Sequence, residues 1–391
     1  MTAHPESASS PLPAPRGDYG VGRVTLDLVD PARTEIYSTA GSRDVRELVV
    51  WVWYPAATAV DAPRADYLPA PWSPTAEFLG LEVDGLHSHA VTDAAPANGS
   101  LRFPVMLLSP SGFPPLLLAT LAEDVASHGF VVVGINHTYE TTVTVFGDGR
   151  VVSMNPAAVG GALGPQSGSS AEAFRARAEV CRSKAADLAF VADELVRLDD
   201  DYGQPFAGRL DLDRLGAVGH SFGGVAALEW CRRKDSRCRA AVNLDGAIWT
   251  EAGTLGIPRP VLQVLAEHPE FAVPAEQAVA TGAAPSTEWF EAERAITFDG
   301  WRGVHKHSHP SHTVSISGSS HLSFMDVPHL PRAEGALVAA MLSNTTIAPD
   351  RMSRLTADLV LAFFDRYLRG ATAPLLDQPF PAHPELTYGP P

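Results

Sequence analysis

The stretch RLGAVGHSFGGVAALEW, residues 214–230, decides the fold. Its first part, LGAVG (215–219), is short and apolar, as expected for a strand that is buried on both faces. Residues 219–223 fit the pattern G-x-S-x-G, in which the serine occupies a sharp turn between a strand and a helix. The N-terminus of the following helix favours negative charge that develops at this turn. The strand before the pattern and the helix after it distinguish it from a chance match, so Ser221 is the predicted nucleophile.

Short apolar stretches alternate with helical stretches on both sides of this motif. Helices are expected over about 116–129, 171–198 and 351–368. Further strands are expected at 46–55, 103–109, 130–136, 240–244, 260–266 and 313–317. This alternation predicts an α/β fold with a mostly parallel, doubly wound sheet that is flanked by helices. In such a sheet, ligands bind beyond the carboxyl ends of the strands, so polar residues at strand ends are the first candidates for chemistry.

Composition narrows the class of protein. The 391 residues carry a formal net charge of −16, which disfavours a nucleic-acid partner because phosphate binding needs clustered Lys and Arg. Three cysteines are too few for a disulfide framework in a chain of this length, and we expect reduced structural thiols. The first residues lack the features of a secretory signal, and no apolar run reaches about 18 residues. We therefore expect a cytoplasmic protein without stable membrane insertion. The sequence does not indicate its oligomeric state.

A serine nucleophile needs a base to take its proton and an acid to orient that base. On this type of sheet, the chain order is serine, then Asp or Glu, then His. Asp245 ends the strand AAVNL (240–244), and Glu267 follows the next strand. We favour Asp245 as the acid. Glu267 is the alternative acid. If its role is only structural, it is a loop carboxylate that makes a local hydrogen bond.

Two groups of histidines compete for the role of base. His321 lies just beyond the last predicted strand, on a loop of small residues that can carry an imidazole over the edge of the sheet towards Ser221. The run VHKHSHPSH (304–312) comes at or before the start of that strand, away from the catalytic edge. Imidazoles can bind zinc or nickel, but no acidic or cysteine ligand accompanies the run at a recognised spacing. His321 is the predicted base, and the run His305 to His312 is expected to be a loop without a functional metal site.

Six stretches, in this order along the chain, carry a resemblance to a known family. They are WVWYP (51–55), FPVMLLSPSGF (103–113), ASHGFVVVGINH (126–137), GHSFGG (219–224), NLDG (243–246) and TVSISGSSHLSF (313–324). Over roughly residues 20–370 the chain resembles the plasma-type platelet-activating-factor acetylhydrolases and their bacterial relatives, within the α/β-hydrolase superfamily. The resemblance implies Ser221 as nucleophile, His321 as base and Asp245, in preference to Glu267, as acid.

The resemblance also implies an oxyanion hole made by the backbone N–H groups of Phe222 and Phe113. Donors of this kind supply on the order of 3 kcal/mol each to the transition state. This chain departs from the family in having SPSG where the family often has SHG, so that Ser111 stands in place of a histidine. The segments 73–93 and 268–312 are long enough to form a cap, which allows a substrate different from the short-acyl phospholipids of the family.

The expected domain organisation follows from these assignments. Residues 1–17, rich in Pro, Ser and Ala, are expected to form a disordered arm. Residues 18–370 form the α/β-hydrolase domain, and the proline-rich residues 371–391 are expected to lie on its surface as a tail. Within the domain, insertions that can act as a cap are expected at about 60–100, 150–170 and 268–312.

The expected activity is hydrolysis of carboxylic esters through an acyl-enzyme, without a metal or an organic cofactor. By resemblance the substrate is a small molecule with a short acyl group, as in lipid degradation. Candidate pocket residues are Trp72, Pro114 and Trp249. The alternative role for these residues is ordinary packing in the hydrophobic core. One alternative is an acyltransferase of a biosynthetic pathway, in which an alcohol or amine replaces water. The other is a non-catalytic ligand-binding protein, although such proteins usually lose a member of the triad and this chain retains all three.

Overall fold

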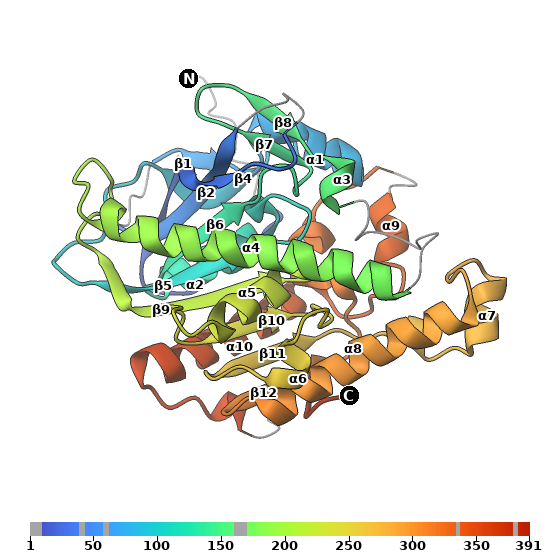
Figure 1. Ribbon diagram of the computed structural model, residues 1–391. Helices are drawn as coiled ribbons and strands as arrows, with labels where there is room; N and C mark the ends of the chain where they lie inside the picture. The colour runs from blue at the N-terminus through green and yellow to red at the C-terminus, as the bar shows by residue number, and fades with distance from the viewer. Residues whose placement is uncertain (1–9, 39–43, 58–61, 160–169, 334–336, 378–381) are drawn as a thin grey trace, which may run out of the picture.

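A computed structural model describes residues 10–38, 44–57, 62–159, 170–333, 337–377 and 382–391 (Figure 1). These residues form one large sheet with helices on both faces and a small separate ribbon of two strands. The α/β architecture predicted from the sequence is confirmed. Within the described residues, every helix is too short or too polar to cross a lipid bilayer.

The centre of the large sheet consists of parallel strands in the order β6-β5-β9-β10-β11-β12. These strands are β5 (Phe103–Ser109), β6 (Val131–Asn136), β9 (Leu210–His220), β10 (Ala241–Leu244), β11 (Val261–Leu265) and β12 (Ser311–Ile316). Because they run parallel, their carboxyl ends meet at one edge of the sheet. This edge carries the residues that follow β5, β9, β10 and β12.

Shorter or antiparallel strands extend the sheet on both sides. Beyond β6 the order continues β2-β1-β4-β3, and β13 pairs antiparallel with β12 at the opposite end. The outer strands are β1 (Gly20–Thr34), β2 (Val45–Ala56), β3 (Arg64–Asp66), β4 (His87–Thr92) and β13 (Leu386–Tyr388), and the ribbon is β7 (Val143–Val145) with β8 (Val151–Ser153).

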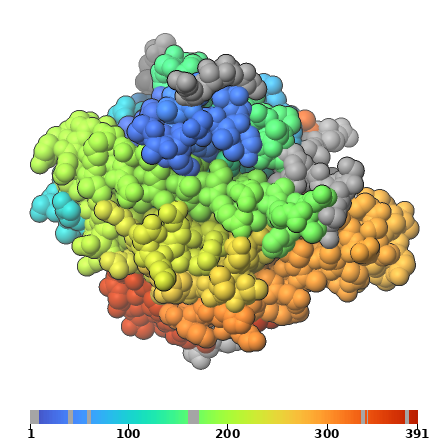
Figure 2. All heavy atoms as spheres, viewed as in Figure 1, coloured from blue at the N-terminus to red at the C-terminus, as the bar shows by residue number. Residues whose placement is uncertain are grey.

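Helices cover the sheet in two layers, with α4 and α5 in front and α2 and α10 behind in the view of Figure 1. Their bounds are α2 (Ala119–Ser127), α4 (Ser170–Asp199), α5 (Phe222–Arg232) and α10 (Pro349–Arg369). The remaining helices are α1 (Ser73–Leu79), α3 (Pro156–Val159), α6 (Ala252–Leu255), α7 (Ala275–Ala280), α8 (Thr287–His307) and α9 (Leu337–Met341). In Figure 2, α7 and the adjoining end of α8 project from one side of the molecule.

Strand β5 shows why the sequence requires both layers. Its side chains alternate between faces, so that Val105 and Leu107 pack in the cluster beneath α4 and α5, whereas Met106 and Leu108 pack in the cluster beneath α2 and α10. All four are fully buried. Full burial of such a side chain contributes about 1.5–3 kcal/mol, which explains the continuous apolar composition of the strand.

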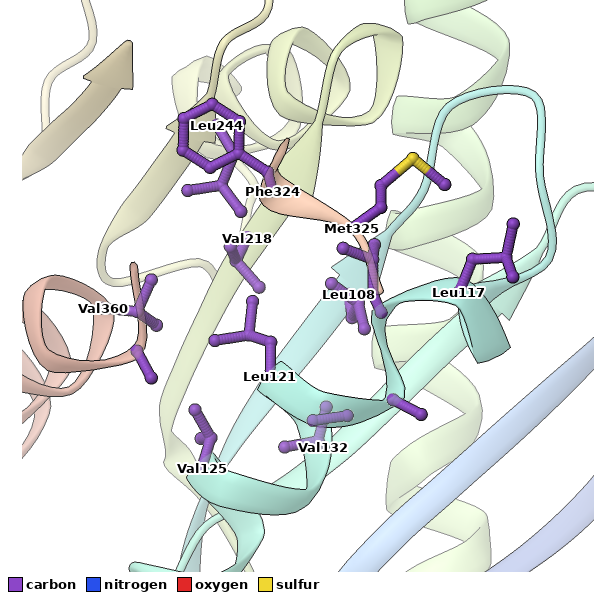
Figure 3. Packing of buried hydrophobic residues seen from close by; sticks show 14 of the residues in the cluster. Leu108, Leu117, Leu121, Val125, Val132, Val218, Leu244, Phe324, Met325 and Val360 are labelled. Carbon is purple, nitrogen blue, oxygen red and sulfur yellow. The ribbon is translucent and has the colours of Figure 1, made fainter. Parts of the chain in front are cut away.

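The cluster beneath α2 and α10 also reaches the segment that carries His321 (Figure 3). The labelled strand residues in that view are Leu108, Val132, Val218 and Leu244, and the labelled helix residues are Leu121, Val125 and Val360. Phe324 and Met325, which follow His321, point into the same cluster. His321 is therefore attached to the core of the domain through its own chain neighbours.

The ends of the chain are more ordered than their composition predicts. Residues 1–9 of the expected arm lie outside the described residues, but residues 10–17 pack on the domain: Leu12 is buried, and Arg16 forms a salt bridge with Asp124 at 2.6 Å. In the expected surface tail, residues 386–388 form strand β13. The prediction failed here because proline content indicates only the local conformation of a segment. It does not indicate whether the segment can pair with the edge strand of a sheet.

Two of the predicted insertions have a definite structure. In the first, about 60–100, β3 and β4 join the edge of the main sheet instead of lying above it, and α1 lies between them. In the second, about 150–170, residues 160–169 lie outside the described residues. The third, 268–312, forms α7 and α8 and ends in β12.

Buried Asp326 gives the fold a pH-dependent element. Its carboxylate lies 3.1 Å from the Tyr67 hydroxyl and 3.3 Å from the backbone N–H of Thr120, and burial raises its pKa from 3.8 to about 7. A carboxyl whose pKa is raised on folding stabilises the protein at low pH, and this contribution is lost as the pH rises through the folded value. Stability from this group is therefore expected to fall between about pH 4 and pH 7.

Asp326→Asn is expected to remove this loss, because an amide does not ionise. The melting temperature of the variant should match that of the wild type near pH 4 and exceed it by several degrees at pH 8. Thermal unfolding followed by circular dichroism across this range measures the difference. Asp84→Asn, at an exposed position, is the control and should follow the wild type. A parallel pH dependence of wild type and Asp326→Asn would contradict the assignment.

Candidate active site

Ser221 occupies a strained turn between β9 and α5. Its φ of 58° and ψ of −123° lie outside the regions that most non-glycine residues adopt. The turn is held by the backbone N–H of Ser221, which donates to Leu244 O of the neighbouring strand at 2.9 Å, and by Ser221 O, which accepts from Gly224 N–H at 3.0 Å. The strand–turn–helix context predicted for the motif is therefore present.

Small residues around the turn allow very close backbone approach. A Cβ atom on Gly223 would lie 1.9 Å from Ser109 O, at the end of β5, and a Cβ on Gly219 would lie 2.2 Å from Gly223. A Cβ on Gly246 would lie 2.3 Å from Ser221 O. The serine turn thus packs directly against the ends of β5 and β10, where the loops with other candidate site residues begin.

Asp245 follows β10 in a second strained turn, with a φ of 56°. Its backbone N–H donates to Val264 O at 2.9 Å. The buried side chain of Asn243 closes the turn, because it donates to Gly246 O at 2.8 Å and accepts from the Gly246 N–H at 2.9 Å. These bonds fix the direction in which the Asp245 side chain leaves the sheet.

His321 lies at the start of a short 3-10 turn, His321–Phe324, beyond the carboxyl end of β12. Its Nδ1 lies 2.7 Å from Asp245 Oδ2. The buried His220, which precedes Ser221, stacks on His321 with ring centroids 4.5 Å apart and donates from Nε2 to His321 O at 2.8 Å. Burial, followed by the charge of His321, lowers the pKa of His220 to about 3. His220 is thus a neutral support that holds the His321 backbone beside the serine turn.

Asp245 is fully buried yet ionised. Burial alone would raise its pKa, but the charges and hydrogen bonds of His268 and His321 outweigh burial and lower the pKa below its usual value. Because an ionised carboxylate only accepts hydrogen bonds, Nδ1 of His321 carries the hydrogen, and Nε2 of the neutral ring is left as the basic atom. This is the tautomer that a general base for a serine requires.

The alternative acid, Glu267, follows strand β11. Its side chain is exposed, one residue beyond Ala266, whose backbone N–H donates to Asp245 Oδ1 at 2.8 Å. The neighbouring His268 also contacts Asp245 Oδ1, at 2.9 Å. The geometry favours Asp245 as the acid.

The loop that carries the proposed oxyanion donor Phe113 follows β5. Phe113 is half-buried, and its ring centroid lies 6.4 Å from that of Phe78 on α1. The loop is anchored by two bonds: Lys184 Nζ donates to Ser111 O at 2.9 Å, and the Thr142 N–H donates to Gly112 O at 3.0 Å. The other proposed donor, the N–H of Phe222, belongs to the first residue of α5. Both donors thus lie in segments that start at the carboxyl edge of the sheet.

Lys184 belongs to a buried network behind this loop. Asp187 contacts Arg46 at 2.6 Å and His137 Nδ1 at 2.7 Å, and His137 Nε2 lies 2.9 Å from the hydroxyl of Ser109. Hydrogen bonds link a serine, a histidine and an aspartate here as in a triad, although their chain order, Ser109, His137, Asp187, differs from that of the candidate site. Their side chains are fully buried, however, so they cannot meet a substrate. Burial, followed by the charge of Lys184, lowers the pKa of His137 to about 4, so this histidine is a neutral structural link.

The three candidate pocket residues occupy different environments. Trp72 lies in the core, edge-on to Trp51 with centroids 5.5 Å apart, and Pro114 is buried. Trp249, in contrast, is half-buried beside the serine turn, with its ring centroid 4.7 Å from that of Phe222. Arg177 of α4 lies over the Trp249 ring at 5.5 Å. The structure therefore brings Trp249 to the site and places Trp72 in the packing of the domain.

The histidine run is more regular than the predicted loop. His305 and His307 form the last turn of α8, and His312 lies in β12, where its Nε2 is 2.8 Å from the Tyr367 hydroxyl. Only the short link around His309 is irregular. The helix was hard to predict because two of its buried positions, Glu293 and Thr297, carry polar side chains and so interrupt the apolar pattern. Across the part of the chain that the structure describes, no three His, Cys, Asp or Glu side chains gather as a candidate metal site. Cys181, Cys231 and Cys238 are free and buried, as predicted.

Sequence reasoning missed His268, Asn243 and Lys184. His268 contacts Asp245 across 23 residues of sequence, and Lys184, in the middle of α4, reaches Ser111 in the loop after β5. Neither pairing has a local spacing that a pattern could reveal. Asn243 did carry a signal, since Asn-x-Asp-Gly after a buried strand is typical of a tight turn closed by an Asx side chain.

The sheet order, the strained serine turn between strand and helix, and the chain order serine, aspartate, histidine define an α/β-hydrolase. Residues 189–372 match the family described as platelet-activating factor acetylhydrolase, isoform II. Together with the relatives described next, this match shows that the chain belongs to the family of the platelet-activating factor acetylhydrolases and their bacterial relatives.

Three relatives illustrate this membership. A probable 1-alkyl-2-acetylglycerophosphocholine esterase of Arthroderma benhamiae is 28% identical over 64% of this chain and 64% of its own length. The platelet-activating factor acetylhydrolase of Bos taurus is 25% identical over 67% of this chain and 61% of its own length. The chain thus matches less than two thirds of either relative. The structure of a ferulic acid esterase from Streptomyces cinnamoneus is 31% identical, covers 97% of this chain and 99% of its own, and superposes with a TM-score of 0.74.

Proposed function

We propose that the protein is a serine carboxylic-ester hydrolase that acts through Ser221, His321 and Asp245. The observation that carries the proposal is the 2.7 Å contact between His321 Nδ1 and Asp245 Oδ2, beside a serine held in a strained turn at the carboxyl edge of the sheet. Membership in a family of ester hydrolases supports the same reaction.

In the proposed mechanism, Ser221 Oγ bonds to the ester carbonyl carbon while His321 Nε2 takes the hydroxyl proton. Asp245 stabilises the imidazolium that forms. The tetrahedral intermediate then collapses, and the proton passes from His321 to the leaving alcohol, so that an acyl-enzyme remains. A water oxygen then bonds to the acyl carbon while His321 Nε2 takes a proton from the water. The bond between the acyl carbon and Ser221 Oγ breaks, His321 returns the proton to Oγ, and the carboxylic acid leaves.

The negative charge of the intermediate would be received by the backbone N–H groups of Phe222 and Phe113. Phe222 begins α5, so the positive end of the helix adds to its donor. The Phe113 loop is tied down by Lys184 and Thr142 before substrate arrives. Donors that are fixed in advance stabilise developing charge without reorganisation, which is the main source of their catalytic effect.

A short-acyl ester is the first candidate substrate, because one relative is named for a 1-alkyl-2-acetylglycerophosphocholine ester and another is named an acetylhydrolase. An aromatic acyl ester is the second. It is favoured by the ring of Trp249, which lies 4.7 Å from that of Phe222 beside the nucleophile, and by the esterase of Streptomyces cinnamoneus, named for ferulic acid. A half-buried indole at this position offers a stacking surface for a planar acyl group.

A panel of esters tests the proposal and separates the two candidates. Nitrophenyl esters from acetyl to dodecanoyl, together with methyl ferulate, are supplied to the wild-type protein, and kcat/KM is measured for each. We expect turnover to be fastest with acetyl and to fall with acyl length. A higher kcat/KM for methyl ferulate would replace the short-acyl assignment with an aromatic one. Absence of turnover on every ester would overturn the hydrolase proposal and favour the ligand-binding alternative.

A fluorophosphonate probe tests the nucleophile directly, since it phosphonylates an activated serine. Mass spectrometry of the digested protein should locate the label on Ser221 and leave the buried Ser109 unlabelled. Label on any other serine would contradict the assignment. The acyltransferase alternative is tested in the same assay by adding alcohols and amines: transfer product in excess of free acid would replace hydrolysis as the activity.

A further inference from the structure

His268 lies between two carboxylates at the end of β11. Its Nε2 is 2.9 Å from Asp245 Oδ1, and its Nδ1 is 2.7 Å from Glu270 Oε1. An ionised carboxylate can only accept a hydrogen bond, so both ring nitrogens must carry a hydrogen. The geometry therefore makes His268 an imidazolium, whereas His321, on the other oxygen of Asp245, has only one nitrogen facing a carboxylate.

The position of the His268 ring is fixed by aromatic neighbours. Its centroid lies 5.2 Å from that of Trp301 and 6.1 Å from that of Phe271, and its side chain is 12% exposed. Trp301, on α8, also donates from Nε1 to Gly246 O at 2.9 Å. One indole thus supports both His268 and the turn that carries Asp245, so the ring cannot shift independently of the carboxylate.

Asp245 divides its two oxygens between different partners. Oδ1 accepts from the Ala266 N–H at 2.8 Å and from His268, whereas Oδ2 accepts from His321 at 2.7 Å. Two donors on Oδ1 fix the plane of the carboxylate and leave Oδ2 directed at His321. Burial by itself lowers the pKa of His268, but the charge and hydrogen bond of Asp245 and then those of Glu270 raise it to about 10. The cation therefore persists throughout the neutral range.

We propose that His268 is a positioning residue of the active site, which orients the Asp245 carboxylate towards His321. As a fixed cation, it also offsets part of the negative charge of Asp245 that acts on His321. The proposal rests on the function proposed above for Ser221, Asp245 and His321. His268 acts through Asp245 and is not itself a catalytic residue. The proposal gives a role to the charged side chain of His268, which the acyl-transfer steps themselves do not require.

The charge balance around the base predicts the sign of the effect. The titratable groups that face His268 are Asp245 and the half-exposed Glu270, and those that face His321 are Asp245 and the neutral His220. Removal of the His268 charge leaves Asp245 uncompensated beside His321, so the protonated form of His321 becomes more favourable. The pKa that controls the acid limb of the pH–rate profile should therefore rise.

His268→Gln keeps a donor for Asp245 without the charge, and His268→Ala removes both. For His268→Gln we expect the acid limb of kcat/KM to move up by about 0.5–1 pH unit, with kcat at its plateau close to the wild-type value. For His268→Ala we expect the same shift and, in addition, a loss of kcat of about ten-fold at unchanged KM. Glu270→Gln, which alters only the outer partner, is the matched control and should leave the acid limb in place.

The outcomes separate positioning from a structural role. An unshifted acid limb in both variants would overturn the proposal. Loss of kcat that merely follows a lower melting temperature in both variants, again without a shift of the limb, would overturn it as well. A shifted limb in His268→Gln with the melting temperature of the wild type is the result that positioning requires.

A second measurement is independent of the proposed function. In Ser221→Ala, the titration of the His321 ring is followed by nitrogen-15 NMR, with and without His268→Gln. The His321 pKa is expected to be higher in the double variant. If the wild type hydrolyses no ester but this difference is found, the hydrolase proposal fails while the positioning role stands. An equal pKa in both proteins removes the positioning role even if the enzyme is active.

Discussion

Asp245→Asn is expected to lower kcat by about 10⁴-fold with little change in KM. The size of the loss follows from the two donors on Oδ1. The Ala266 N–H and the His268 imidazolium both require an acceptor there, so the amide oxygen of asparagine must take this place and its NH₂ must face His321. An NH₂ group forces Nδ1 of His321 to accept, which places the ring hydrogen on Nε2. That tautomer cannot take the proton from Ser221. Steady-state kinetics near pH 7 measures the loss.

Glu267→Gln is the matched control, because it neutralises the other candidate acid at an exposed position and should retain wild-type kcat. Ser221→Ala sets the lower limit of activity. Near-normal kcat in Asp245→Asn together with an impaired Glu267→Gln would move the acid role to Glu267.

Asp187→Asn is expected to lower the free energy of unfolding by about 3–5 kcal/mol, the usual cost of breaking a buried ion pair. Arg46 is almost fully buried and contacts Asp187, Glu35 and Glu140. Burial by itself raises the pKa of Asp187, but the charge of Arg46 and the hydrogen bond from His137 outweigh it and hold the pKa well below its usual value. Without the carboxylate, a buried guanidinium loses its closest counter-charge. Urea unfolding followed by fluorescence measures the difference.

The control for this variant is Asp365→Asn, which removes a carboxylate paired with Arg369 at the surface. Such pairs contribute less than about 1 kcal/mol, so this variant should unfold close to the wild type. If the free energy of unfolding fell equally in the two variants, burial would not be the reason for the strength of the ion pair between Asp187 and Arg46. Loss of stability in Asp187→Asn should also loosen the Ser111 loop, since Lys184 belongs to the same network.

The best-predicted elements were the strands that are buried on both faces and the long helices that cover them. Strands β5, β6 and β10, and the long helices α4 and α10, lie within two residues of the expected bounds, because a buried strand must be apolar throughout and a covering helix must have one apolar face. Strands β3 and β13 and helix α8 were missed. Each lies at an edge of the sheet or projects from it, where partner elements far along the chain, and not the local pattern, determine the structure.

The same distinction holds at the site. Ser221, Asp245 and His321 could be selected as candidates because each follows a recognisable strand, and parallel strands bring their carboxyl ends together. His268 also follows a strand, but its role depends on which oxygen of Asp245 it meets and on the ring of Trp301 beside it. Those relations arise from the packing of α8 against the sheet and are absent from any local stretch of sequence.

The glycine contacts between the serine turn and the ends of β5 and β10 have a consequence for how this protein can change. Where a single added methyl group would overlap a backbone oxygen, as at Gly223 and Gly246, neither turn can vary in sequence or move without the other. New specificity must therefore arise at side chains that are free of these contacts, such as the half-buried Trp249 and the exposed Phe78. Substitutions that aim at a new substrate should therefore change these side chains and keep the glycines of the two turns.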